Sequence, residues 1–463
     1  MTTHQPDETA ALQAEVAAFR EAHPDVRGID VIFADLCGIV RGKRYPAAEL
    51  EKIAAQGVGF PGSAFLLDVL GENHDPMGIG FSDGDPDVLA MPIAGTLTRV
   101  PWAPRPLGQV LTAFRHPDGT PYAYDPRNVL ANVAANLGAL GLQPVVAFEL
   151  EFYLIDPERA PGGAPRPPLS PMTKQRDEGT QVYGMADVDA FDDLLGEITA
   201  ACEVQGIPTG AISAEYAPGQ FEINLGHVAD PLRAADHCAL FKRVVKGVAR
   251  RHGYQATFMA KPYPQHAGSG MHMHISLLDR DGRNVFDGGA EGPVSETLRR
   301  GMGGILAALP ESMGILAPNP NAYRRFQPNI FVPLGRSWGF ENRSVALRIP
   351  QGDGQARRIE HRVAGADANP YLTLATALAG LHHGITEGAD PGAAHPGNAG
   401  AAFDRAIPWR PRRAFEAMAE APILRRYLGP AYVDAYAACK LAEMDAFEAE
   451  PSPLEYRYYL QPD

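Results

Sequence analysis

Cysteine and long apolar runs are both scarce in this chain of 463 residues. The cysteines lie far apart and lack the short spacings of zinc or redox motifs: Cys37, Cys202, Cys238 and Cys439. We expect them to be buried thiols in a reducing compartment. We find no apolar run long enough to span a membrane, and no basic segment leading into an apolar run that would predict a signal peptide. These features predict a cytoplasmic protein without membrane contact.

Positive charge is also in short supply. Lysine and arginine number 41 against 55 acidic residues, which gives a formal net charge of -14. This balance argues against nucleic-acid binding. Hydrophobic residues make up 45% of the chain, so a sizeable core can form. The length predicts two or more domains, or a small domain beside a large one.

The first part of the chain is predicted to be rich in β-strands. Residues 8–22 have the apolar spacing of an amphipathic helix, and Asp25–Leu50 predicts two strands joined by a turn at Gly38. The segment Asp87–Ile93 and the TLTRVPW run after it resemble further strands. The acidic residues from Asp68 onward in the preceding loop are expected to be mostly solvated charges.

A domain boundary is expected where turn residues cluster, at Pro117–Asp125. We therefore predict an N-terminal domain of residues 1–118 and a second domain of residues 119–463. Helices are predicted in the second domain over Pro126–Leu140, Asp187–Gly206, Asp230–His252, Asn369–Ile385 and most of Arg412–Phe447. Asp187 and Asp230 are candidate N-caps, and Asn369 precedes a proline at the first helical position. With strands between these helices, the fold class is α+β.

Some strand-like segments of the second domain carry polar side chains on one face only: Val145–Ile155, Gln220–Leu225, Met271–Leu277 and Arg358–Val363. Alternate side chains of a strand point to opposite faces, so each segment has an apolar face for a core and a polar face. The polar faces carry Glu149, Glu151, Glu222, His272, His274, Ser276, Arg358, Glu360 and Arg362. Carboxylates and imidazoles bind divalent cations, and guanidinium groups bind phosphate. The sequence therefore predicts a cleft that holds metal ions and phosphate together.

A series of motifs occurs in a fixed order: FELEFYL, the spaced pair Glu215 and Glu222, GSGMHMHISL, NAYRRFQP, ENRSVALRIP and RRIEHR. Together they resemble the glutamine synthetase family, type I, over nearly the whole chain from about Gly38. The resemblance implies a small β-grasp-like N-terminal domain on a large catalytic domain with a curved antiparallel sheet. It also implies a homo-oligomer of two stacked hexameric rings, with active sites between neighbouring subunits.

The resemblance implies two or more Mg²⁺ or Mn²⁺ ions in each active site. Glu151, Glu215 and Glu222 match the ligands of one ion. Glu149, His272 and Glu360 match the ligands of the other. The chemistry agrees, because carboxylates suit a hard cation and one imidazole is compatible with manganese. Zinc would favour thiolates or several histidines.

The family uses ATP to phosphorylate the side-chain carboxylate of glutamate, and the γ-glutamyl phosphate then reacts with an amine. Arg343, Arg348 and Arg358 match the arginines that hold the phosphates and the transferring phosphoryl group. His274 and Ser276 match nucleotide-contacting positions. Glutamate-binding positions are matched by Gly268, Arg325 and Arg362. These roles are chemically reasonable, since phosphoryl transfer depends on positioning and positive charge.

The chain departs from the family pattern at four positions. Pro61 replaces the aspartate of the ammonium-site loop, and Phe331 replaces the flap glutamate. Ala267 stands where an asparagine contacts glutamate, and Phe403 stands where many bacterial enzymes carry the adenylylated tyrosine. Two acids that bind ammonium are therefore absent, which leaves a more apolar amine pocket. We do not expect control by adenylylation.

These departures resemble the γ-glutamylamine ligase branch, which includes γ-glutamylpolyamine synthetases and relatives that act on ethanolamine or other monoamines. The leading hypothesis is an ATP-dependent ligase that joins the γ-carboxylate of glutamate to a primary amine. Putrescine is our first candidate amine and ethanolamine the second. The alternatives are an ammonia-using glutamine synthetase with a rearranged amine site, a catalytically silent scaffold of the same fold, and another metal-dependent acid–amine ligase or hydrolase.

Overall fold

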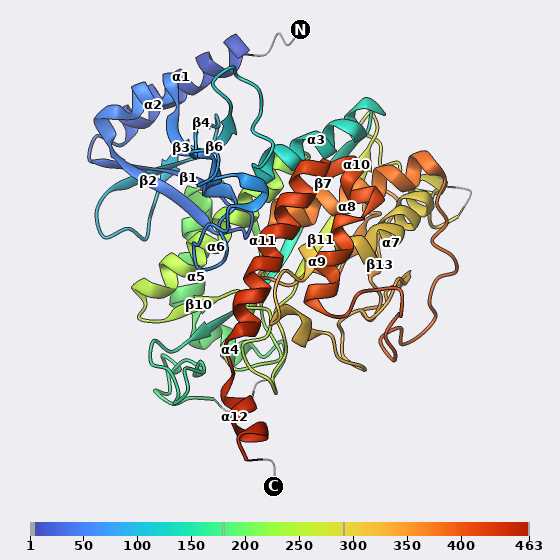
Figure 1. Cartoon of the computed structure of the whole chain (residues 1–463). Helices are drawn as coiled ribbons and strands as arrows, with labels where there is room; N and C mark the ends of the chain where they lie inside the picture. The colour runs from blue at the N-terminus through green and yellow to red at the C-terminus, as the bar shows by residue number, and fades with distance from the viewer. Residues whose placement is uncertain (1–4, 178, 180, 290–291, 462–463) are drawn as a thin grey trace.

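The structure is a computed structural model that describes residues 5–177, 179, 181–289 and 292–461 (Figure 1). Two sheets organise the chain, one of six strands and one of eight. The first sheet uses residues up to Arg115, and the second begins at Gln143. The α+β fold class is confirmed by this arrangement. The exact division at residue 118 stays a prediction.

The N-terminal sheet has the strand order β2-β1-β6-β4-β3, and β5 pairs with β6. Its elements are α1 (Gln5–Ala22), β1 (Gly28–Ala34), β2 (Val40–Pro46), α2 (Leu50–Gln56), β3 (Val58–Pro61), β4 (Asp87–Pro92), β5 (Thr98–Arg99) and β6 (Leu107–Arg115). The predicted turn at Gly38 is confirmed, with a φ of 74° that favours glycine. The strand expected from TLTRVPW is only two residues long, because β5 pairs with β6 just at Thr98 and Arg99.

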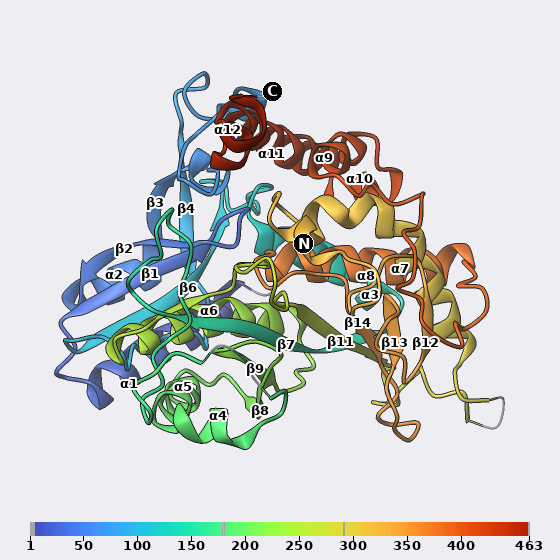
Figure 2. The ribbon, with the colours of Figure 1, turned by 90° about the horizontal axis from the view of Figure 1, so that it is seen from below.

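The larger sheet has the order β12-β13-β14-β11-β7-β9-β8, and β10 pairs with β7. Its strands are β7 (Gln143–Ile155), β8 (Thr209–Ala214), β9 (Gln220–Leu225), β10 (Gln255–Thr257), β11 (Met271–Leu278), β12 (Trp338–Phe340), β13 (Leu347–Ile349) and β14 (Ile359–His361). The predicted antiparallel pairing is found in most of this sheet, and one edge differs, where β12 and β13 run parallel. Figures 1 and 2 place the N-terminal sheet and the β12–β13 edge on opposite sides of the molecule.

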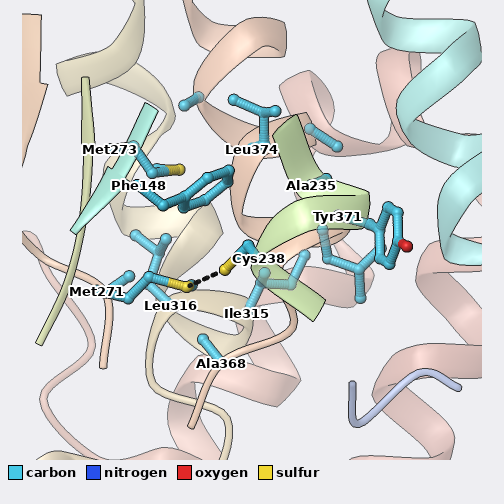
Figure 3. Close-up of a cluster of buried hydrophobic side chains, with 14 of the residues drawn as sticks. Phe148, Ala235, Cys238, Met271, Met273, Ile315, Leu316, Ala368, Tyr371 and Leu374 are labelled. Atoms are coloured by element: carbon cyan, nitrogen blue, oxygen red, sulfur yellow. Dashed lines mark hydrogen bonds between the residues drawn. The ribbon is translucent and has the colours of Figure 1, made fainter. Parts of the chain in front are cut away.

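The apolar face of the larger sheet rests on helices. These are α3 (Pro126–Ala139), α6 (Pro231–Arg251), α7 (Glu296–Leu316) and α8 (Pro370–Glu387). Figure 3 shows Phe148 of β7 and Met271 of β11 beside Cys238 of α6, with the Cys238 Sγ 3.7 Å from the Met271 Sδ. This packing fixes which face of each strand is buried, so the polar side chains must face the other way.

Asn369 links the N-terminal hairpin to helix α8 of the second domain. The Asn369 side chain caps α8 by accepting from the Tyr371 amide, as predicted, and its Nδ2 donates to the Asp35 carbonyl at 2.8 Å. The predicted cap at Asp230 is also confirmed, because its carboxylate accepts from the first amides of α6. The C-terminal helices α9 (Pro411–Ala419), α10 (Pro422–Leu428), α11 (Pro430–Ala449) and α12 (Pro453–Tyr459) complete the fold.

Several local predictions need correction. The helix expected over Asp187–Gly206 is two helices, α4 (Met185–Ala190) and α5 (Asp192–Val204), broken at the buried Phe191. Asp187 lies inside α4, and Gly184 takes the N-cap position. Asp68, expected to be a solvated charge, is 3% exposed and its Oδ2 lies 2.9 Å from His74 Nε2.

The cysteines and the membrane prediction can also be compared with the structure. Among the described residues all four cysteines are free thiols, three of them buried and Cys37 partly buried. No described helix combines the length and the apolar character that a membrane span requires.

Candidate active site

Strand register brings the polar faces together. β7 lies between β9 and β11, so Glu149 stands opposite His272 on one side and Asn224 on the other. Glu151, two residues along, stands opposite Glu222. Because all of these positions share the face away from the helices, residues more than a hundred positions apart meet on one surface.

The centre of this surface is a candidate metal site. One ligand atom from each of Glu149, Glu222 and His272 lies within 4.8 Å of the others. The Glu149 Oε2 is 3.2 Å from His272 Nδ1. Glu151 adjoins them, and its Oε2 accepts from the Gly270 amide at 3.0 Å and from Gln220 Nε2 at 3.2 Å.

The other two predicted ligands lie at the margins of this cluster. The Glu215 backbone amide donates to the Gln220 carbonyl, which holds Glu215 at the end of the β8–β9 hairpin. Glu360 is 1% exposed, and its Oε1 is 4.0 Å from His272 Nδ1. In this structure its carboxylate is paired with Arg348 at 2.6 Å and with Arg362. Five of the six predicted ligands therefore lie on strands of the larger sheet, and Glu215 lies in the turn between β8 and β9.

The shifted pKa values of the clustered carboxyl groups indicate that the site fits a cation. Burial and the neighbouring Glu151 raise the pKa of Glu222 to about 9 and that of Glu215 to about 7. Burial opposes ionisation of Glu149 as well, but hydrogen bonds with His272 and His274 lower its pKa below the usual range. Clustered carboxylates that retain protons are a donor set that a hard divalent cation would satisfy. The residues present therefore fit Mg²⁺ or Mn²⁺.

The predicted phosphate-binding arginines lie along one side of the cluster. Arg358 donates from Nε to His274 Nδ1 at 3.1 Å, which links it to Glu149 through the imidazole. Arg348 donates from Nη1 to Glu360 Oε2, and its Nη2 lies 3.3 Å from Glu341 Oε1. Arg343 is exposed. Ser276 is partly buried, two residues beyond His274 on β11.

The predicted glutamate-binding positions form the other side. Arg325 ends a short 3-10 helix (Ala322–Arg325), is 3% exposed, and donates to the Val363 carbonyl at 3.1 Å. Gly268 packs against it so closely that an added Cβ would lie 2.6 Å from the Arg325 side chain. Arg362 is also buried and donates from Nε to the Arg343 carbonyl. A negatively charged substrate group at this side would meet two buried guanidinium groups.

The predicted amine-site residues do not meet within one chain. Phe331 is 57% exposed and lines a cavity of about 700 Å³ with Phe340, Arg343 and His395. Pro61 ends β3 in the N-terminal sheet, and Figure 2 shows β3 on the opposite side of the molecule from β12, the strand that carries Phe340 of this cavity.

Ala267 and Phe403, the other two residues that differ from the family pattern, have ordinary structural roles. The Ala267 carbonyl accepts from the Tyr153 hydroxyl at 2.6 Å. Phe403 is 40% exposed and packs on Trp409 with ring centroids 5.0 Å apart.

Some site residues were missed from the sequence. Gln220 and Asn224 contact Glu151 and Glu149, and their place on the same strand face as Glu222 was a usable signal. Tyr183, whose pKa is raised by burial and which also lies within electrostatic range of Arg343 and Glu215, comes from a loop with no recognisable pattern.

Comparisons with known proteins agree with this geometry. The family model described as "Glutamine synthetase, catalytic domain" matches residues 123–459. Gamma-glutamylputrescine synthetase PuuA of Escherichia coli K12 is 42% identical over 452 residues, which cover 98% of this chain and 95% of that protein. A glutamate–isopropylamine ligase of a Pseudomonas species is 34% identical over 375 residues, 80% of each chain. The solved structure of the GmaS/ADP complex superposes with a TM-score of 0.82 at 29% identity, covering 96% of this chain and 99% of that one.

Proposed function

This chain belongs to the glutamine synthetase family, and from that premise we propose that it is an ATP-dependent ligase joining the γ-carboxylate of glutamate to a primary amine. The observation that carries the proposal is the meeting of Glu149, Glu222 and His272 within 4.8 Å, beside a row of arginines. The comparisons add that two similar proteins are named for joining glutamate to putrescine or isopropylamine.

The metal site follows the predicted pattern. Two or more Mg²⁺ or Mn²⁺ ions would be held by the three glutamates Glu151, Glu215 and Glu222, and by Glu149, His272 and Glu360. When bound, such ions neutralise phosphate charge and orient the oxygens of ATP. Hydrogen bonds hold two of these carboxylates in place. Gly270 and Gln220 donate to Glu151, and His274 contacts Glu149.

Phosphoryl transfer is the first step. A γ-carboxylate oxygen of glutamate attacks the terminal phosphorus of ATP, and the bond to ADP breaks. In this proposal Arg348, which contacts Glu360, and Arg358, which contacts His274, would stabilise the charge that develops on the transferring group, and the exposed Arg343 would add a third guanidinium group. Their fork geometry suits phosphate oxygens, and stabilising the developing charge is the main contribution a protein makes to this reaction.

Amide formation is the second step. The amine nitrogen attacks the acyl carbon, the bond from that carbon to the phosphate oxygen breaks, and inorganic phosphate leaves while solvent takes up the proton that the nitrogen loses. Arg325, Arg362 and Gly268 would hold glutamate during both steps. His274 and Ser276 would contact the nucleotide.

The amine would enter from the cavity that Phe331 lines. Its apolar wall, including Phe340, suits the methylenes of an alkylamine better than a bare ammonium ion. We propose putrescine or a small alkylamine such as ethanolamine as the substrate. Pro61 could reach this cavity only from a neighbouring copy of the chain, so the proposal includes a homo-oligomer of two stacked hexameric rings with active sites between subunits.

One experiment tests the function. Phosphate release is measured with ATP, glutamate and Mg²⁺ against ammonium, putrescine, ethanolamine and methylamine, and kcat/KM is compared. We expect an alkylamine or diamine to exceed ammonium. A preference for ammonium would make the chain an ordinary glutamine synthetase. No turnover with any amine would make it a silent scaffold.

A further inference from the structure

A second cavity, of about 360 Å³, lies between the N-terminal hairpin and the catalytic domain, and we call it the interdomain cavity. Its walls come from the β1–β2 turn at Cys37–Val40, from α6, from Thr257–Met259 after β10, from Pro318–Asn319 after α7, and from Asp367 and Lys440. It shares no lining residue with the Phe331 cavity.

Basic side chains dominate this cavity. Its lining includes Lys242, Arg243, Lys246, Arg250 and Lys440, against the single acid Asp367. Arg243 is neutralised by Asp30 at 2.6 Å, and Lys440 by Glu443 at 2.9 Å. The other three cations, Lys242, Lys246 and Arg250, have no carboxylate partner among the described residues. Such a concentration stands out in a chain with a net charge of -14.

Lys242 is the most informative of the three. It is 8% exposed, and its Nζ donates to the Ala368 carbonyl at 2.8 Å. Its Nζ and that of Lys246 lie 5.7 and 5.9 Å from the centre of the Phe258 ring. Burial lowers the pKa of Lys242 to about 8, the nearby Lys246 lowers it further, and the more distant Asp367 compensates only in part. A buried ammonium that has no carboxylate within ion-pair distance and faces a cavity is a position that an anion would stabilise.

We propose that the interdomain cavity binds a small polyanion, a polycarboxylate or a phosphate ester, between Lys242, Lys246 and Arg250. The volume admits a metabolite-sized molecule and excludes a folded partner. Phe258 and the exposed Met259 provide apolar surface on which a short apolar portion of the ligand could pack.

The cavity adjoins the back of the candidate active site. Asp367, at its wall, accepts from Asn319 Nδ2 at 2.7 Å through Oδ2. A Cβ on Gly365 would lie 2.5 Å from Asp367 Oδ1 and 3.4 Å from a terminal nitrogen of Arg325, so the carboxylate and the guanidinium are neighbours. The Asp367 Oδ1 has no hydrogen-bond partner among the described residues. An anion bound beside Asp367 would therefore change the charge that Arg325 experiences.

The functional consequence rests on the proposed function, in which Arg325 binds glutamate. Occupancy of the interdomain cavity should change the KM for glutamate more than the KM for the amine. The ligand would then act as a regulator of glutamate binding.

Calorimetric titration of the metal-free and nucleotide-free full chain tests the binding. The probes are inorganic pyrophosphate for the phosphate chemistry and tricarballylate for the carboxylate chemistry. The double variant Lys246→Gln/Arg250→Gln removes two exposed cations of the cavity. The matched control is Arg251→Gln, an exposed arginine of the same helix that pairs with Glu197 away from the cavity. Arg358→Gln weakens any binding at the active site.

The double variant should bind at least one probe with an affinity lower by about tenfold or more. Arg251→Gln and Arg358→Gln should keep the affinity for that probe within about twofold of the wild-type value. The probe whose affinity falls in the double variant identifies the chemical class of the ligand. Retention of wild-type affinity for both probes in the double variant, or failure of both to bind the wild-type protein, would overturn the proposal. Circular dichroism melting checks that the variants fold.

A kinetic measurement completes the test. The responsive probe should shift the glutamate KM of the wild-type protein but not that of the double variant. An unshifted glutamate KM would overturn the coupling to Arg325. If no ligase activity is found with any amine, the proposed function fails, while calorimetry still decides whether the cavity binds anions.

Discussion

His274 connects Glu149 to Arg358: its Nε2 lies 2.7 Å from Glu149 Oε1, and its Nδ1 lies 3.1 Å from Arg358 Nε. A guanidinium group can only donate, so Nδ1 is the acceptor and Nε2 carries the proton that Glu149 accepts. The imidazole is thereby fixed as one neutral tautomer. It positions a candidate metal ligand and a candidate phosphate-binding arginine at the same time.

Replacing His274 by Gln should weaken metal binding and turnover together. Loss of such an orienting contact typically costs 10- to 100-fold in metal affinity or activity. The measurement is Mn²⁺ titration with steady-state phosphate release. His252→Gln is the control, because His252 pairs with Glu197 at 2.8 Å outside the candidate active site. Equal effects of both substitutions would argue against a specific role for His274.

Glu360 should be needed for both activity and stability. Glu360→Gln keeps the shape and should reduce turnover by about a hundredfold or more. Glu360→Ala should in addition lower the free energy of unfolding by about 3–5 kcal/mol, since it leaves Arg362 buried without its carboxylate partner. Denaturant unfolding and phosphate release separate the two effects. Near-normal turnover in Glu360→Gln would remove Glu360 from the site.

Arg348 should act on phosphoryl transfer through its geometry. Arg348→Lys keeps the charge but cannot contact Glu360, Glu341 and a phosphate oxygen with one planar fork. We expect kcat to fall by about a hundredfold. Arg336→Lys is the control, because Arg336 pairs with Asp404 in a half-exposed contact. An unchanged kcat in Arg348→Lys would show that the residue is structural.

Phe331 should control the choice between ammonium and alkylamine. Phe331→Glu places a carboxylate at the position where the family pattern has the flap glutamate, in addition to Glu341 of the same cavity. Each buried methylene of an alkylamine contributes about 0.8 kcal/mol, and the substitution removes part of that apolar surface. We expect the kcat/KM ratio of ammonium to putrescine to rise by about tenfold or more. The same ratio in Phe403→Tyr, outside the cavity lining, should stay unchanged.

Metal binding should release a proton. Glu222, whose pKa is raised to about 9 by burial and then by Glu151, is protonated in the metal-free protein at pH 7.5. A cation that binds its carboxylate must displace that proton, so about one proton per chain should appear. Calorimetry of Mn²⁺ binding in two buffers of different ionisation enthalpy measures the number. Glu222→Gln should remove most of the release, because Glu215, with a pKa raised to about 7, contributes only a fraction of a proton at pH 7.5, and zero protons from the wild-type protein would contradict the assignment.

The sequence by itself determined which residues share a face. The period of two along β7, β9 and β11 predicts that Glu149, Glu151, Glu222 and His272 point away from the core, and the structure confirms these strands. The caps at Asp230 and Asn369 were equally predictable, because capping depends on a few neighbouring residues.

Only the tertiary structure decided which faces meet. Strand order and register placed Glu149 beside His272, and neither is a local property of the chain. The same holds for the buried Asp68, the break at Phe191 and the interdomain cavity, whose lysines come from two helices far apart in the sequence, α6 and α11. The family resemblance implies active sites between subunits, but the separation of Pro61 from Phe331 within one chain follows from no local pattern, because it depends on how the two sheets pack.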